Sequence, residues 1–223
     1  MKPNISCLIL DHDDTAVDST AQIHYPAHVA VMEQLRPDQT PVDLENWFRK
    51  NFNPGIMEFL KDELRFTDDE IQVEYDIWRR FTESRTPKFY KGFLEVVQEF
   101  KQRGGIVSVV SHSEVDIIQR TYEVETNGTP FVPDIIFGWD MDATKRKPHP
   151  YPVEQILEIY SLKPEEVLVV DDLKPGVEMA KSAGVPVAAA GWAHQIPEIK
   201  DFMEQSCDVY LPDIQSFRDY VLD

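Results

Sequence analysis

Short apolar runs alternate with helical patterns over most of this chain, and this alternation is the feature that most constrains its fold. Apolar runs occupy residues 106–110, 135–137, 167–170 and 185–190. Between these runs, apolar residues recur at helical spacing, and some of these helical patterns end in glycine. Such alternation is typical of a parallel sheet that helices cover on both faces. With a further apolar run at residues 5–10, we predict an α/β fold with a doubly wound, mostly parallel sheet.

A different pattern fills the segment from about residue 20 to residue 88. It contains no convincing strand pattern, but it carries several amphipathic helix patterns. Residues 67–70 read Thr-Asp-Asp-Glu, the sequence of a capping box that begins a helix. The segment is therefore expected to be an α-helical insertion. One of its apolar stripes consists of Ile56, Phe59, Leu60 and Leu64.

The length of the chain fits one domain that carries an insertion. Its 223 residues exceed the most common domain size of about 100–150 residues. We expect residues 1–17 and 89–223 to form an α/β catalytic core. Residues 18–88 are expected to form an inserted helical cap domain.

The chain is strongly acidic, with 40 acidic and 22 basic residues and a formal net charge of −18. Such a surface would repel a phosphate backbone, which argues against a nucleic-acid partner. Any anionic ligand must therefore be attracted by a local feature, such as a metal ion, a lysine or backbone amides.

The two cysteines, Cys7 and Cys207, suggest no disulfide framework. The chain begins without a charged-then-apolar leader, and no apolar run reaches the ~18 residues of a membrane-spanning helix. We therefore expect a cytoplasmic protein without a membrane partner.

Polar side chains follow several of the predicted strands at the point where each strand ends. Each of these residue types alone is common on solvated loops or in bonds to the backbone. The carboxyl ends of parallel strands share one edge of the sheet, and ligands of open α/β sheets bind there. The set as a whole therefore predicts a functional site. It consists of Asp11, Asp13, Ser111, Lys147, Asp171 and Asp172.

The order and the sequences of these motifs resemble those of the haloacid dehalogenase-like hydrolase superfamily. Within it, they resemble the phosphatases with a helical cap after the first strand. Residues 11–15 match the family's first motif, D-x-D-x-[T/V], and Ser111 matches its hydroxyl residue at a strand end. Lys147 matches its lysine, often in K-P-x-P, and residues 171–176 match its acidic pair followed by glycine. The resemblance spans nearly the whole chain. It implies a Rossmann-like core of the phosphoglycolate phosphatase and β-phosphoglucomutase branch.

This resemblance implies a magnesium-dependent phosphoric monoester hydrolase. Asp11 and Asp172 would bind Mg²⁺ through their carboxylates and Asp13 through its backbone carbonyl, with Asp171 as a candidate outer ligand. Mg²⁺ suits the task because it prefers hard oxygen ligands and offsets the charge of a phosphomonoester. Asp11 would attack phosphorus to form an aspartyl-phosphate, and Asp13 would protonate the leaving alkoxide.

The other motif residues are implied to bind the phosphoryl group. Lys147 and the Ser111 hydroxyl would hold its oxygens, together with backbone amides near His12, Asp13 and His112. The expected partner is a small phosphorylated metabolite. The sequence leaves its identity open, and it leaves open whether the protein is a monomer or a homodimer.

Two other functions stay open on the sequence. Asp13 favours cleavage of a phosphate ester, because the dehalogenases and the phosphonate-cleaving relatives lack this aspartate. Phosphosugar mutases similar to β-phosphoglucomutase share all four motifs. They carry a cap-hinge histidine, however, where this chain has Ile23, with His24 one residue later. A non-catalytic binding protein is the third interpretation, and the intact motif set argues against it.

Two residues of the first motif depart from the family pattern. Asp14 stands where glycine is usual, and aspartate tolerates a left-handed backbone better than most residues. His12 stands where the family often has an apolar residue, so it either packs in the interior or contacts substrate. The sequence leaves both roles open.

Overall fold

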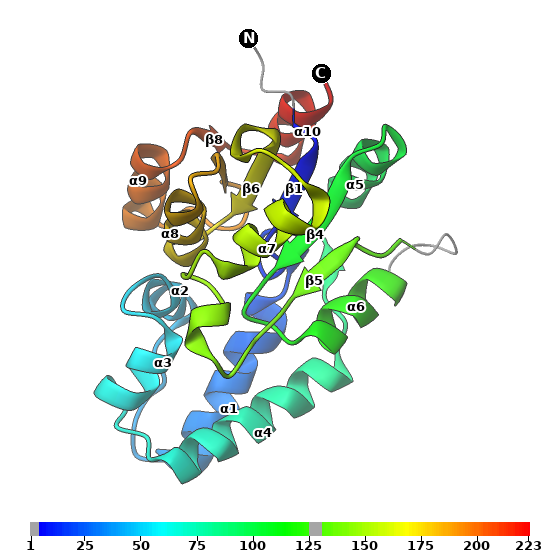
Figure 1. The fold of residues 1–223 in the computed structure, drawn as a ribbon. Coiled ribbons are helices and arrows are strands. Elements are labelled where there is room, and N and C mark those ends of the chain that lie inside the picture. The colour runs from blue at the N-terminus through cyan, green and yellow to red at the C-terminus, as the bar shows by residue number, and fades with distance from the viewer. Residues whose placement is uncertain (1–4, 125–130) are drawn as a thin grey trace. The chain divides into compact units, whose positions relative to one another are not determined.

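The structure of the protein, a computed structural model, describes residues 5–124 and 131–223 (Figure 1). The chain divides into two compact units. One consists of Met1–Asp18 and Lys88–Asp223, and the other of Ser19–Pro87.

Six parallel strands form the sheet of the larger unit, in the order β5-β4-β1-β6-β7-β8. The first strand of the chain therefore lies inside the sheet, between β4 and β6. This topology confirms the predicted α/β fold with a doubly wound parallel sheet. The strands are β1 (Cys7–Leu10), β4 (Ile106–Val110), β5 (Ile135–Phe137), β6 (Val167–Asp171), β7 (Val187–Ala190) and β8 (Val209–Leu211).

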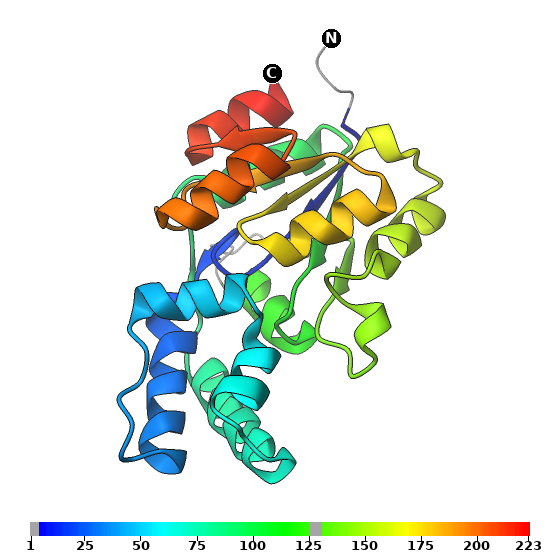
Figure 2. The ribbon, with the colours of Figure 1, turned by 90° about the vertical axis from the view of Figure 1, so that its left-hand side faces the viewer.

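Helices cover both faces of this sheet (Figure 2). One face carries α7, α8 and α9, and the other carries α5, α6 and α10, with α10 packed on α5. Because both faces are covered, the strands are apolar along their length, as in the successive residues Leu8 and Ile9, which point to opposite faces and are both buried. The helices are α5 (Phe93–Gln102), α6 (Val115–Val124), α7 (Tyr151–Tyr160), α8 (Lys174–Ala183), α9 (Pro197–Ser206) and α10 (Ile214–Leu222).

The strand register brings the ends of the three central strands level with one another. Leu10 of β1 pairs with Val109 of β4 and with Val170 of β6. The amide of Asp11 continues the ladder by donating to the Val170 carbonyl at 2.9 Å. The residues that follow β1, β4 and β6 therefore start from one edge of the sheet. A two-stranded antiparallel ribbon, β2 (Val17–Asp18) with β3 (Lys88–Phe89), completes the strands.

The secondary-structure elements of the smaller unit are all helices, which confirms the predicted helical insertion after the first strand. The capping box predicted at residues 67–70 is present: Thr67 accepts from the Glu70 amide, and the Glu70 side chain accepts from the Thr67 amide. Its core packs His28 flat on Trp47, with ring centroids 4.2 Å apart. Its elements are η1 (Thr20–His24), α1 (Tyr25–Leu35), α2 (Leu44–Phe52), α3 (Ile56–Glu58), η2 (Phe59–Glu63) and α4 (Asp68–Ser84).

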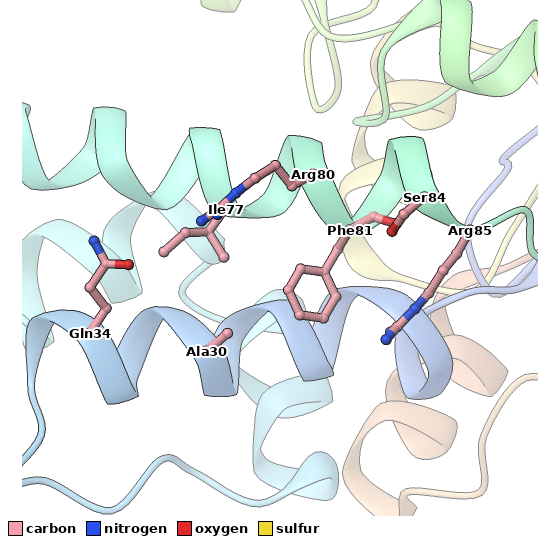
Figure 3. A pocket seen from close by; sticks show the side chains of 7 residues that line it. All are labelled: Ala30, Gln34, Ile77, Arg80, Phe81, Ser84 and Arg85. Carbon is pink, nitrogen blue, oxygen red and sulfur yellow. The ribbon is translucent and has the colours of Figure 1, made fainter.

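A pocket of about 330 Å³ lies between α1 and α4 of this unit (Figure 3). Arg85 lies over the ring of Phe81, 4.8 Å from its centroid, and donates to the Gln22 carbonyl at 2.9 Å. Arg80 also lines the pocket, so two guanidinium groups give it a basic wall in an otherwise acidic chain.

Among the described residues, none of the helices combines the length and the apolar character that crossing a membrane would demand. Cys7 and Cys207 are both free thiols, as expected from the absence of a disulfide framework in the sequence.

Candidate active site and cation site

Three aspartates meet at the carboxyl edge of the sheet. Asp11 follows β1, Asp171 ends β6 and Asp172 follows it. Each offers a carboxylate oxygen within 4.8 Å of the other two, and all three side chains are buried. The structure thus brings together residues that lie some 160 positions apart in the sequence.

Lys147 supplies the counter-charge of this carboxylate cluster. Its Nζ donates to Asp11 Oδ1 at 2.7 Å and to Asp171 Oδ2 at 2.8 Å, and the side chain is buried. Burial alone would lower the pKa of Lys147, but the two carboxylates raise it above its ordinary value. The residue is therefore a charged ammonium held between two acids.

The carboxylates are too crowded for all of them to ionise freely. Burial, together with the neighbouring charges of Asp171 and Asp172, raises the pKa of Asp11 well above its usual range, although Lys147 opposes this. Burial and Asp171 raise the pKa of Asp172 to about 8. Three carboxylates and one ammonium leave a formal charge of −2 when all are ionised. A divalent cation would neutralise that charge.

The same shifts predict how stability depends on pH. Asp172 keeps its proton in the folded chain up to about pH 8, whereas an unfolded aspartate loses it near 3.8. The free energy of unfolding should therefore fall as pH rises toward 8. In chelator, we expect the Tm at pH 8.5 to lie at least about 5 °C below that at pH 6.5, and added Mg²⁺ to reverse the loss.

Thermal melts at the two pH values measure this effect. His28 and His112, whose pKa values burial lowers to about 4, titrate below the window. Burial raises the pKa of Glu74 to about 7, so Glu74 adds to the slope in the same direction. Asp172→Asn is the control, because it removes one of the titrating groups and should reduce the slope. An equal slope in that variant would contradict the assignment.

Two serines hold Asp13. Ser113 Oγ donates to Asp13 Oδ2 at 2.6 Å, and Ser111 Oγ lies 3.3 Å from the same oxygen. The Ser113 amide in turn donates to Ser111 Oγ at 3.1 Å. Ser113 lies two residues before helix α6, which begins at Val115, and its hydroxyl is used at the site.

Removing the Ser113 hydroxyl should therefore impair turnover rather than binding. We expect Ser113→Ala to lower kcat about tenfold, the effect of one lost hydrogen bond of about 1.4 kcal/mol, and to leave KM within about twofold. Ser113→Thr, which keeps the hydroxyl, should restore most of the rate. Steady-state kinetics measure both, with Ser182→Ala, at an exposed serine of α8, as control. A larger change in KM than in kcat would contradict this role.

His112 fixes the backbone beside Lys147. Its Nε2 lies 2.9 Å from the Lys147 carbonyl, and burial with the nearby Lys147 charge lowers its pKa to about 4. A neutral imidazole must donate this bond from Nε2–H, because a carbonyl can only accept. The ring also meets Trp139 edge-on, with centroids 5.8 Å apart. His112 therefore contacts the site through its side chain, which the sequence did not indicate.

Local backbone geometry explains two further residues of the motifs. Asp14 has φ +57°, so it does adopt the left-handed backbone that its position was predicted to require. Gly176 is needed for space: a Cβ there would lie 2.0 Å from Asp171 Oδ2. His12 is 1% exposed, and its ring centroid is 6.0 Å from that of Tyr122, which favours packing.

Besides Ser113, three further residues at the site were not predicted from the sequence. Thr15 Oγ1 donates to Asp172 Oδ1 at 3.2 Å. Trp192 Nε1 donates to the Thr15 carbonyl at 2.9 Å, and His194 Nε2 lies 3.5 Å from Asp172 Oδ2. Only Thr15 belongs to a motif. The other two lie in the loop after β7, where no sequence pattern marked them.

The site fits a hard divalent cation. Its donors are carboxylate oxygens, the ligands that Mg²⁺ and Ca²⁺ prefer. Asp172 Oδ2 is buried and makes no hydrogen bond within residues 5–124 and 131–223. Such an atom is costly to leave unpaired, and a cation would satisfy it.

A Rossmann-like sheet with a helical insertion after its first strand, and with carboxylates and a lysine at its carboxyl edge, defines a class of hydrolases that use aspartates at the end of the first strand. The haloacid dehalogenase-like hydrolase family matches residues 8–190 of this chain, and the chain belongs to that family. It is an enzyme, a phosphohydrolase of this family.

Individual relatives agree with this assignment. Pyrophosphatase PpaX of Bacillus cereus (strain Q1) is 24% identical over 192 residues, which covers 84% of each chain. A haloacid dehalogenase-like family hydrolase from Streptococcus pneumoniae has the same fold, with a TM-score of 0.75 at 17% identity, covering 97% and 98% of the two chains. The structure of CbbY from Rhodobacter sphaeroides, solved with phosphate, matches this chain with a TM-score of 0.71 at 20% identity, covering 93% of each chain.

Proposed function

We propose that the protein is a Mg²⁺-dependent phosphatase that hydrolyses a small phosphorylated metabolite through an aspartyl-phosphate on Asp11. The observation that supports this most is the pair of carboxylates at the end of β1. Asp11 is paired with Lys147, whereas Asp13 is held separately by two serine hydroxyls. Two carboxylates in such different surroundings suit two different roles.

In the first half-reaction, a carboxylate oxygen of Asp11 attacks phosphorus, and the bond between phosphorus and the ester oxygen breaks. The leaving alkoxide takes a proton from the Asp13 carboxyl group. In the second half-reaction, water attacks the phosphorus of the aspartyl-phosphate, and Asp13 takes up a proton from this water. The bond between phosphorus and the Asp11 oxygen breaks, which releases inorganic phosphate and restores the Asp11 carboxylate and the Asp13 carboxyl group.

The phosphoryl oxygens need donors as charge spreads over them in the transition state. Lys147 and the Ser111 hydroxyl are the side chains proposed to supply them, with backbone amides near His12, Asp13 and His112. His112 would assist indirectly, because its bond to the Lys147 carbonyl fixes the backbone that carries the lysine.

Asp11 and Asp172 are proposed to hold the Mg²⁺ through carboxylates and Asp13 through its carbonyl, with Asp171 in an outer position. When bound, the cation supplies positive charge that lets an anionic substrate approach an acidic site. Both oxygens of Asp171 already accept hydrogen bonds, Oδ2 from Lys147 at 2.8 Å and Oδ1 from the Leu173 amide at 2.9 Å, which suits an outer position.

The relatives support a small phosphorylated substrate without identifying it. One similar structure is a mutant of CbbY in complex with xylulose-(1,5)bisphosphate, and one similar sequence is a pyrophosphatase. We propose that residues 18–88 act as the cap domain that selects the substrate.

One contact in the cap argues against the phosphosugar mutase. His24 Nδ1 accepts a hydrogen bond from Trp78 Nε1 at 2.9 Å, and the two rings are nearly parallel. Ile23 is buried in the same unit. His24 is thus hydrogen-bonded to another residue of the cap, which favours hydrolysis over transfer of a phosphoryl group within a bound sugar.

The test is a screen of phosphorylated metabolites, with phosphate release measured with and without Mg²⁺. Acid quenching during turnover, followed by peptide mass spectrometry, should find a phosphoryl group on Asp11. Interconversion of hexose phosphates with little free phosphate would point to the mutase. Absence of any metal-dependent turnover would overturn the proposal.

A further inference from the structure

His194 contacts one aspartate of the carboxylate cluster, Asp172, from the loop that follows β7. Its Nε2 lies 3.5 Å from Asp172 Oδ2, and the two side chains are only 10% and 2% exposed. The loop is tied to the first motif, because Trp192 Nε1 donates to the Thr15 carbonyl at 2.9 Å. Gln195 Nε2 closes the loop on itself by donating to the Gly191 carbonyl at 2.8 Å.

The Asp172 carboxylate is arranged so that one oxygen is available on this side. Its Oδ1 accepts from Thr15, whereas Oδ2 makes no hydrogen bond in the part of the chain that the structure describes. Adjacent ligands of an octahedral ion with bonds near 2.1 Å lie about 3 Å apart. The 3.5 Å between Oδ2 and the imidazole nitrogen of His194 is close to that spacing.

We propose that His194 is a nitrogen ligand of the cation site, and that it gives the site selective affinity for first-row transition ions. Imidazole is a good ligand for such ions, whereas Mg²⁺ prefers oxygen and keeps its waters. The carboxylates alone would bind both kinds of ion. With His194, a transition ion gains one protein ligand that Mg²⁺ does not use. This inference rests on the cation site of the proposed function.

Co²⁺ is the probe, added to the full-length, metal-free protein. A histidine bound to high-spin Co²⁺ through Nε2 shows a strongly shifted, exchangeable Nδ1–H signal in the proton NMR spectrum. We expect that signal in the wild type and its loss in His194→Ala. Titrations should show that His194→Ala weakens Co²⁺ binding about tenfold or more and changes Mg²⁺ binding less than about twofold.

Two variants make the result decisive. His149→Ala removes an exposed histidine and should keep both the NMR signal and the Co²⁺ affinity. Asp172→Asn should abolish binding of both ions. If Co²⁺ binds the wild type without the shifted signal, or equally well to His194→Ala, the inference is wrong and the cation site stands. If neither ion binds the wild type, the cation site itself fails.

Discussion

Replacing Asp11 by asparagine should abolish phosphate release while leaving the protein folded. An amide oxygen is a poor nucleophile, and loss of a nucleophile can cost about 10⁴-fold or more in kcat. The fold should survive, because the neutral amide would relieve a crowded cluster in which Asp171 still pairs with Lys147. Phosphate release under saturating Mg²⁺ measures the rate, and thermal melts measure the fold.

The matched control is Asp201→Asn, which makes the same chemical change on the exposed surface of α9. That variant should keep the wild-type rate. If Asp11→Asn retained more than about a tenth of the activity, Asp11 could not be the group that forms the covalent intermediate.

Replacing Lys147 by methionine should strongly lower the free energy of unfolding. The change keeps most of the side-chain volume but leaves Asp11 and Asp171 buried without their shared ammonium. Breaking a buried ion pair on one side costs about 3–5 kcal/mol. We expect that loss in the free energy of unfolding at pH 8 in chelator, together with loss of activity.

The size of this loss should depend on pH and on metal. The pKa of Asp11 is raised, so protonation can relieve the unpaired charge in acid, and the loss should be smaller at pH 5.5. Mg²⁺ should restore part of the stability at pH 8. Lys91→Met, at an exposed lysine, is the control and should stay within about 0.5 kcal/mol of wild type. Equal losses in the two variants would contradict the role of Lys147.

The sequence predicted those parts of the fold that depend on strong local patterns. The apolar run at residues 106–110 is β4, and the capping box at Thr67 begins α4. The predicted run at residues 185–190 is shorter as a strand, since β7 begins at Val187. The elements after it, α9, β8 and α10, were not predicted. A three-residue edge strand such as β8 carries too little pattern to distinguish it from a loop.

The residues of the site also fall into two groups, those that a sequence motif marks and those that only the folded loops bring in. The motifs led to Asp11, Ser111, Lys147 and Asp172. The parallel register brings the three residues after β1, β4 and β6 to one sheet edge, and Lys147 reaches them from the segment before α7. Ser113 and His194 were not predicted as part of it, because their contribution depends on where a loop turns rather than on a local pattern. His194 reaches Asp172 only through the folded loop after β7.

The place of β1 in the sheet has a consequence for biosynthesis. Strand β1 leaves the ribosome long before one of its two neighbours in the sheet, β6, which ends at Asp171. The strand can pair with β4 on one side, but its other edge stays unpaired in the nascent chain until β6 has been translated. Such intermediates are prone to aggregate, and C-terminally shortened products should depend on chaperones far more than the finished protein.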